Sequence, residues 1–236
     1  MAHELAIDSQ GAQMLFAGET PWHKLGVKID KAVTAEEALA ICRADYTVYT
    51  GGLFTSKSVP VRAQYIYRLD AEGNQQVLGD HVGPDYTPLQ NRDAFAWFNP
   101  FIEAGEAVID TAGVMRDGAR VWVLARINRK SMEILPGDEV VKYVLLSNSH
   151  DGMMAARVGY SAVRVVCANT LAMAIEDKAS KLMRVKHTKN IKEAIVSIRE
   201  TMNLADAAFE ATAEQYRRLV KYQVVEADIK KYVQRV

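Results

Sequence analysis

The chain has few cysteines, few prolines and no long hydrophobic run. Two cysteines among 236 residues, Cys42 and Cys167, exclude a disulfide framework, and their spacing excludes a Cys-x-x-Cys metal motif. No stretch of about 18 apolar residues is present to span a bilayer. The first residues lack the basic and apolar regions of an export signal. We therefore expect a cytoplasmic protein that does not bind membranes.

Motifs for nucleotide and metal chemistry are missing as well. The sequence holds no glycine-rich phosphate loop, no Walker lysine and no dinucleotide fingerprint. His150 is a lone histidine with no second metal ligand at a useful spacing. We therefore expect no cofactor and no metal, and we assign no catalytic residue.

The net charge of zero conceals an uneven distribution along a chain of ordinary globular composition, with 49% hydrophobic and 25% charged residues. Residues 1–110 hold 8 Lys and Arg against 15 Asp and Glu, whereas residues 111–236 hold 21 against 14. Such asymmetry indicates a basic surface for a polyanion, or contacts between the acidic and basic poles of neighbouring subunits.

The periodicity of apolar residues predicts an α+β fold, in which a mostly antiparallel, meandering sheet with packed helices precedes a long carboxy-terminal helical segment. Alternation and turn residues predict seven strands, at residues 46–54, 61–69, 75–82, 108–115, 120–127, 140–147 and 155–166. Asp117-Gly118 and Asp151-Gly152 are typical of hairpin turns, because this pair adopts positive φ angles readily.

Helix signals occur before, within and after the predicted sheet. Thr34 and Glu37 form a capping box that follows an irregular amino-terminal arm. A helix is expected at 91–103, where Pro100 should kink or end it. Asn169 or Thr170 can cap another helix. A last helix is expected to begin near Asn190 and to carry a heptad stripe of mostly apolar residues from Ile191 to Leu219. We predict an arm with a short helix (1–45), an α+β core (46–183) and a helical oligomerisation or packing segment (184–236).

The strongest functional signal is a basic segment at residues 178–192, which contains six cations and no acidic residue. Like charges repel unless a counter-charge is near, and nucleic-acid phosphates supply one with release of counterions. The alternatives are a solvated connector between two helices, or a patch that meets the acidic half of another subunit.

A second basic group lies in the predicted strands, at Arg120, Arg126, Arg129, Lys130, Lys142, Arg157 and Arg164. Tyr160 is on the Arg164 side of its strand, and an aromatic ring beside cations can stack on bases of a single strand. Most strand aromatics pack into cores instead. We predict the following nucleic-acid-binding residues: Lys142, Arg157, Tyr160, Arg164, Lys178, Lys181, Arg184, Lys186, Lys189 and Lys192.

Two positions suggest catalysis, but each also has a structural interpretation. A thiol at the start of a helix, such as Cys167, can act as a nucleophile, yet the preceding residues are those of a buried strand and unpaired cysteine is usually buried. His150 and Asp151 lie in a predicted hairpin turn, where aspartate favours the backbone conformation.

Three sequence blocks keep their order over about residues 20–175: Pro-Trp-His-Lys-Leu-Gly-Val (21–27), Asn-Ser-His-Asp-Gly (148–152) and Val-Arg-Val-Val-Cys-Ala-Asn-Thr-Leu (163–171). They resemble the signature blocks of a large uncharacterised family of phage/plasmid-like proteins. The resemblance implies a role in DNA replication, recombination or defence of a mobile element, and it transfers no activity to any residue. The architecture is also similar to phage single-strand-annealing recombinases of the Red-beta and RecT type, which hold single-stranded DNA in a basic groove.

The sequence therefore predicts an oligomeric single-stranded-DNA-binding protein that promotes annealing or recombination for a mobile element without nucleotide hydrolysis. Its expected partners are single-stranded DNA, further copies of itself in a ring or helical filament, and phage or host recombination proteins. Two alternatives stay open: a nucleic-acid-modifying enzyme that uses Cys167, or His150 with Asp151, and a structural or protein-interaction module.

Overall fold

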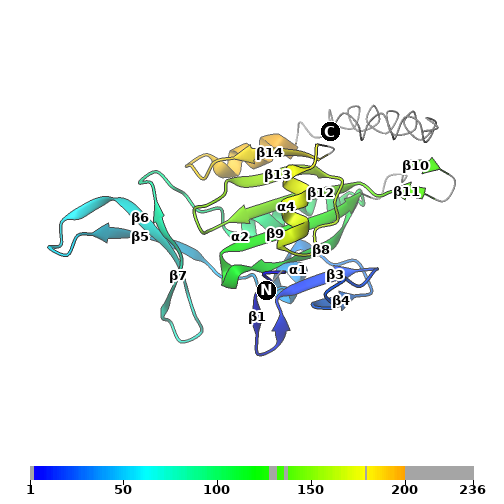
Figure 1. Ribbon diagram of the computed structural model, residues 1–236. Coiled ribbons are helices and arrows are strands. Elements are labelled where there is room, and N and C mark those ends of the chain that lie inside the picture. The colour runs from blue at the N-terminus through cyan, green and yellow to red at the C-terminus, as the bar shows by residue number, and fades with distance from the viewer. Residues whose placement is uncertain (1–2, 128–131, 136–137, 179, 200–236) are drawn as a thin grey trace, which may run out of the picture.

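A seven-stranded sheet forms the body of the protein in the computed structural model, which describes residues 3–127, 132–135, 138–178 and 180–199 (Figure 1). The strand order is β14-β13-β12-β9-β8-β3-β4, and every pair except β3 with β4 is antiparallel. The strands are β3 (Met14–Ala17), β4 (Val27–Ile29), β8 (Ala107–Met115), β9 (Arg120–Ile127), β12 (Tyr143–Ser149), β13 (Ala156–Ser161) and β14 (Lys181–Val185).

Helices lie on both faces of this main sheet. In Figure 1, α4 (Ala168–Glu176) crosses the front face, whereas α1 (Ala35–Ile41) and α2 (Asn91–Ala96) lie behind it. The rear core joins alternate residues of the central strands to α1, α2 and the helical residues 191–199. The front core contains Trp122, Leu145 and Leu171. The central strands are thus buried on both faces.

A second sheet projects from the body as an arm (Figure 1). It consists of β5 (Val48–Phe54), β6 (Pro60–Leu69) and β7 (Gln75–Val82), all antiparallel. A small apolar cluster joins the arm to the turn between β8 and β9: Val48, Ile66, Leu78, Val82 and Ala119. The remaining elements are α3 (Asn99–Glu103), a 3-10 turn (Arg116–Gly118) and the hairpins β1 (Ile7–Asp8) with β2 (Gly11–Ala12) and β10 (Met132–Leu135) with β11 (Asp138–Val140).

Several local predictions are confirmed. The strands expected at 75–82 and 120–127 have the predicted bounds, and Thr34 and Glu37 form the capping box. Pro100 lies in the first turn of α3, so the helix expected at 91–103 is divided in two. At the β8–β9 turn, Asp117 and Gly118 have φ angles of 52° and 104°. The α+β class and the mostly antiparallel pairing follow from these elements.

Other predictions are wrong because tertiary pairing overrides the local signal. Part of the amino-terminal segment that was expected to be irregular forms β3 and β4 of the main sheet. The basic segment at 178–192, for which a connector between two helices was one alternative, contains β14. The strand expected at 155–166 ends at Ser161, and the turn expected at Asp151-Gly152 is part of a six-residue connection between β12 and β13. The heptad segment beyond residue 199 lies outside the described residues.

A glycine in β8 tests the packing of the front core. The indole of Trp122 lies over Gly113, and an added Cβ would also be 2.8 Å from the carbonyl oxygen of Gln13. We expect Gly113→Ala to lower the free energy of unfolding by about 1–3 kcal/mol, because the ring has to shift in a close-packed core. Chemical denaturation measures the change. Gly83→Ala is the matched control, because an added Cβ there meets no atom within 4 Å; equal losses in both variants would contradict the packing argument.

Candidate functional site

Five cations lie at one edge of the main sheet, on and around β14; we call them the basic edge. They are Lys178, Lys181, Arg184, Lys186 and Lys189. All five are exposed, and none forms an ion pair with a residue in the described part of the chain. The Lys181 ammonium donates a hydrogen bond to the Lys178 carbonyl oxygen at 3.4 Å. The edge therefore presents positive charge directly to solvent.

Other predicted nucleic-acid-binding residues have partners within the protein. Lys192 forms an ion pair with Asp93 at 2.7 Å. Arg164 forms an ion pair with Asp110 at 2.6 Å and donates hydrogen bonds to the carbonyl oxygens of residues 17 and 19. These contacts join the strand that carries Asp110 to the amino-terminal segment, so a phosphate at Arg164 would have to compete with partners within the protein.

Tyr160 also differs from the prediction. Its side chain packs in the rear core with 7% of its surface exposed, and the Lys142 ammonium lies 4.1 Å from the ring centroid. The ring is thus largely covered by protein atoms, and Lys142 lies over one of its faces. Tyr160 and Lys142 form a cation–π pair with each other, so a base would have to displace Lys142 to stack on that face of the ring.

Asn148 and His150, from the block 148–152, form a buried polar centre between β12 and α2. The His187 Nε2 lies 2.7 Å from Asn148 Oδ1, and Asn148 Nδ2 donates to the Leu89 carbonyl oxygen at 2.8 Å. The His150 Nε2 lies 2.8 Å from Asn91 Oδ1. Since Asn148, His150 and Asn91 are fully buried, each of these hydrogen bonds replaces one to water.

Burial keeps both imidazoles neutral. It lowers the pKa of His150 to about 3 and that of His187 to about 4, and for His150 the neighbouring His187 lowers the pKa further. His150 is wholly covered, and its nearest hydrogen-bonding neighbours are amides. The arrangement holds the end of β12 in place and gives His150 no contact with a substrate.

Asp151 has its own set of partners and does not contact His150 through a hydrogen bond. Its carboxylate accepts hydrogen bonds from Arg120 Nε at 2.9 Å, the Met153 N–H at 2.9 Å and the Ser149 hydroxyl. Burial raises the pKa of Asp151, but the hydrogen bonds and the Arg120 charge outweigh burial and lower it below the ordinary value. Asp151 therefore fixes the turn as an anion.

The other two sequence blocks meet at the beginning of α4. The His23 Nε2 lies 3.1 Å from the Val166 carbonyl oxygen, and the Ala168 N–H donates to the carbonyl oxygen of His3. Cys167 precedes the first turn of α4 and is fully buried, with its sulfur 3.6 Å from Thr170 Oγ1. The block thus anchors the amino-terminal segment, and the thiol has no access to a substrate.

The sequence analysis overlooked an aromatic surface on the arm. Tyr67 stacks on Tyr49 and on Tyr65, with centroid separations of 5.4 and 5.3 Å. Six of the 13 exposed large hydrophobic side chains in the described chain lie on the arm: Tyr49, Phe54, Val59, Val61, Leu69 and Val77. Alternating Tyr65 and Tyr67 were the available signal, but sequence alone does not show which strand faces stay uncovered.

The described residues contain no helix that is long and apolar enough to cross a membrane. Nor, within those same residues, do three or more His, Cys, Asp or Glu side chains gather in a way that would hold a metal ion.

The two buried imidazoles make stability depend on pH. Unfolding raises each histidine pKa to about 6.5, so the unfolded chain binds protons that the folded chain excludes. We expect the free energy of unfolding to fall below pH 6.5, by about 1.4 kcal/mol per pH unit for each histidine, down to about pH 4 for His187. Urea titrations between pH 7 and pH 4.5 measure this slope.

The variant His187→Gln separates the histidine from carboxylates that titrate in the same range. Glutamine keeps an N–H donor for Asn148 but does not titrate, so the variant should lose about half of the slope. A slope equal to that of the parent would show that His187 is already protonated in the folded protein.

Comparison with protein families gives one match, and it covers more than half of the chain. The model described as "Domain of unknown function (DUF932)" matches residues 79–236, which include the polar centre, α4 and the basic edge. Neither the curated proteins nor the solved structures gave a significant match. The matched segment begins within β7, so most of the arm and the strands β3 and β4 of the main sheet lie before it in the sequence. The chain belongs to the DUF932 family, whose function is unknown.

Proposed function

We propose that this protein binds single-stranded DNA along the basic edge. The observation that carries the proposal is the run of five exposed cations without ion pairs among the described residues. Elsewhere in the described chain, Arg43, Arg92, Arg116, Arg120 and Arg164 each have a carboxylate partner. Other exposed cations without an ion pair, such as Lys28 and Lys57, are not gathered in a comparable group of five. The contrast supports a ligand that supplies the missing negative charge.

The shape of the ligand follows from the placement of the cations. β14 is extended and lies at the edge of the sheet, and the flanking residues prolong the positive track at both ends. An extended polyanion fits such a track, because successive phosphates can each neutralise one cation and release bound counterions.

The biological setting and the assembly are further parts of the proposal. The resemblance of three sequence blocks to phage/plasmid-like proteins, and the similar order of elements to annealing recombinases of the Red-beta and RecT type, support annealing or recombination for a mobile element without nucleotide hydrolysis. The opposite charges of the two chain halves support head-to-tail association in a ring or filament. Phage or host recombination proteins would be the further partners.

The first test replaces Lys178, Lys181, Lys186 and Lys189 together by glutamate. We expect the variant to lose retention of a labelled single-stranded oligonucleotide at low salt. For the parent, the logarithm of the association constant should fall linearly with the logarithm of salt concentration, by about 0.7 for each phosphate neutralised. Fluorescence anisotropy at three salt concentrations measures both quantities.

The matched control carries the same change in charge elsewhere. Lys28, Lys31, Lys57 and Arg62 are exposed and have no ion pair within the described chain, so their joint replacement by glutamate also removes eight charge units. The control should bind the oligonucleotide with a smaller loss than the first variant. Equal binding by the parent and the first variant would refute the role of the basic edge.

A second candidate function rests on the arm. Its exposed apolar side chains gather near the tip and along one face, and such a surface normally marks an interaction site. The arm holds three basic and three acidic residues between positions 46 and 82, so charge does not favour a polyanion there. A second copy of this chain is the occupant that accords with the proposed oligomer.

Replacing Phe54, Val59 and Val61 by serine tests the arm. All three are exposed, so the fold should change little, whereas the assembly should dissociate toward monomer. Light scattering after size exclusion, at several concentrations of parent and variant, measures the mass. A parent that stays monomeric throughout would exclude self-association through the arm.

The enzymatic alternative gains no support from the geometry. Cys167 and His150 are fully covered, and Asp151 is engaged by Arg120 and Ser149. A general base has to reach the proton that it removes, and neither His150 nor Asp151 is placed to do so.

A further inference from the structure

A row of three polar side chains crosses the front face of the main sheet. Strand pairing places Ser147 of β12 opposite Arg157 of β13, and Arg157 opposite Arg184 of β14. Directly paired residues of antiparallel strands project to the same face, about 4.5–5.5 Å apart. Trp122, which is paired with Ser147 on the other side, belongs to the front core together with Leu171 of α4. The row therefore lies on the face that carries α4.

Two buried polar atoms in this row lack hydrogen bonds. The Ser147 hydroxyl oxygen and the Arg157 Nε are both buried, and neither has a partner among the described residues. A buried donor without an acceptor costs its full desolvation penalty, and the penalty is larger when the group is charged. The protein thus keeps a costly arrangement at adjacent positions of adjacent strands.

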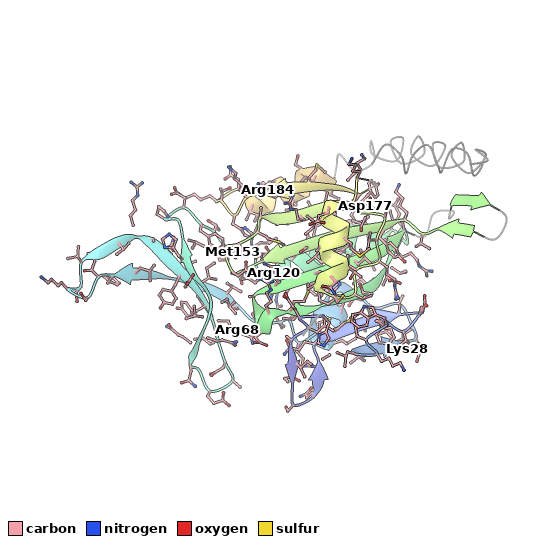
Figure 2. All side chains as sticks on the ribbon, viewed as in Figure 1. Lys28, Arg68, Arg120, Met153, Asp177 and Arg184 are labelled. Atoms are coloured by element: carbon pink, nitrogen blue, oxygen red, sulfur yellow. The ribbon has the colours of Figure 1, made fainter. Side chains whose placement is uncertain are left out.

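The two arginines add electrostatic repulsion to this cost. Arg157 and Arg184 are directly opposed like charges, and neither forms an ion pair with any residue that the structure describes. Like charges in this position destabilise a sheet. At the end of β12, the carboxylate of Asp151 is held by Arg120 at 2.9 Å and so belongs to the turn. In Figure 2, Arg184, Met153 and Arg120 all appear toward the end of the main sheet that faces the arm.

We propose that Ser147, Arg157 and Arg184 form an oxyanion site that binds a phosphate group. The serine hydroxyl and the two guanidinium groups donate hydrogen bonds to its oxygens. One anion removes the repulsion and satisfies both buried atoms, and the planar donor fork of arginine matches phosphate geometry. Arg184 also belongs to the basic edge, so a strand bound there would place a phosphodiester at the site. That assignment of the source rests on the proposed function.

Inorganic phosphate is the first probe. Thermal unfolding of the full chain is followed while phosphate replaces chloride at constant ionic strength. We expect phosphate to raise the melting temperature of the parent, because a ligand that binds only the folded state stabilises it. Arg157→Gln and Ser147→Ala should weaken the apparent phosphate affinity by about tenfold or more for a lost charge-assisted hydrogen bond. The apparent phosphate affinity of Arg157→Lys should lie between those of the parent and of Arg157→Gln, because lysine keeps the positive charge but lacks the two-pronged donor geometry of arginine.

Lys28→Gln is the control matched in charge to Arg157→Gln. Lys28 is exposed on β4, at the opposite edge of the main sheet from β14, so this variant should keep the phosphate response of the parent. Ser147→Ala removes no charge and fills no space, so it preserves the test if Arg157→Gln fails to fold. A parent that responds equally to phosphate and chloride, or variants that respond as the parent does, would overturn the site.

A single-stranded oligonucleotide without terminal phosphates is the second probe. Weaker oligonucleotide binding by Arg157→Gln and Ser147→Ala, together with the lost phosphate response, supports a phosphodiester at the site. Unchanged oligonucleotide binding with a lost phosphate response supports a site for free phosphate or a phosphate monoester. The quadruple glutamate variant leaves Ser147 and both arginines intact, so the failure of DNA binding along the basic edge is distinguishable from the failure of the oxyanion site.

Discussion

The hydrogen bonds of Asn148 hold together parts of the chain that are far apart in sequence. Its side chain joins the end of β12 to Leu89, in the loop before α2, and to His187, two residues after β14. His150 extends the same network to Asn91 at the start of α2. Buried amides and imidazoles are costly unless they are paired, so the network forms only when all of these segments reach their final positions. The positions of the rear core, of α2 and of the basic edge therefore depend on this hydrogen-bond network.

The described basic residues fall into two groups, those with carboxylate partners within the protein and those without. Arginines that join segments, such as Arg164 to the amino-terminal segment and Arg120 to the β12–β13 turn, have carboxylate partners. The cations at the β14 edge have none in the described chain, although acidic and basic residues are equal in number overall. Exposed cations on and beside an edge strand also oppose pairing with the sheet of another molecule, which gives the same residues a protective effect. Binding of a polyanion and avoidance of edge pairing are compatible, because both need exposed positive charge.

Local structure could be predicted well from the sequence, whereas the pairing of strands that are distant in sequence could not. Turn and cap signals located β7, β9, the first helix and the division at Pro100, since each depends on neighbours a few residues away. β3, β4 and β14 are short and lack clear alternation, and they are strands because the central sheet supplies partners at both edges. The basic edge was visible as composition. The burial of Tyr160, the partner of Arg164 and the unpaired Arg157 Nε depend on which faces the sheet covers, which composition does not reveal.

The narrow attachment of the arm has a consequence for how the molecule opens. Among the described residues, one small apolar cluster and a few polar contacts, such as that of the Tyr46 hydroxyl to the Gly118 carbonyl oxygen, secure the three-stranded arm to the β8–β9 turn. The body, by contrast, is sealed by two larger cores. The free energy of local opening scales with such buried contacts, so we expect amide hydrogens of β5 and β6 to exchange with solvent deuterium long before those of β9 and β12. One folded chain would then combine a slowly exchanging centre with a rapidly exchanging projection.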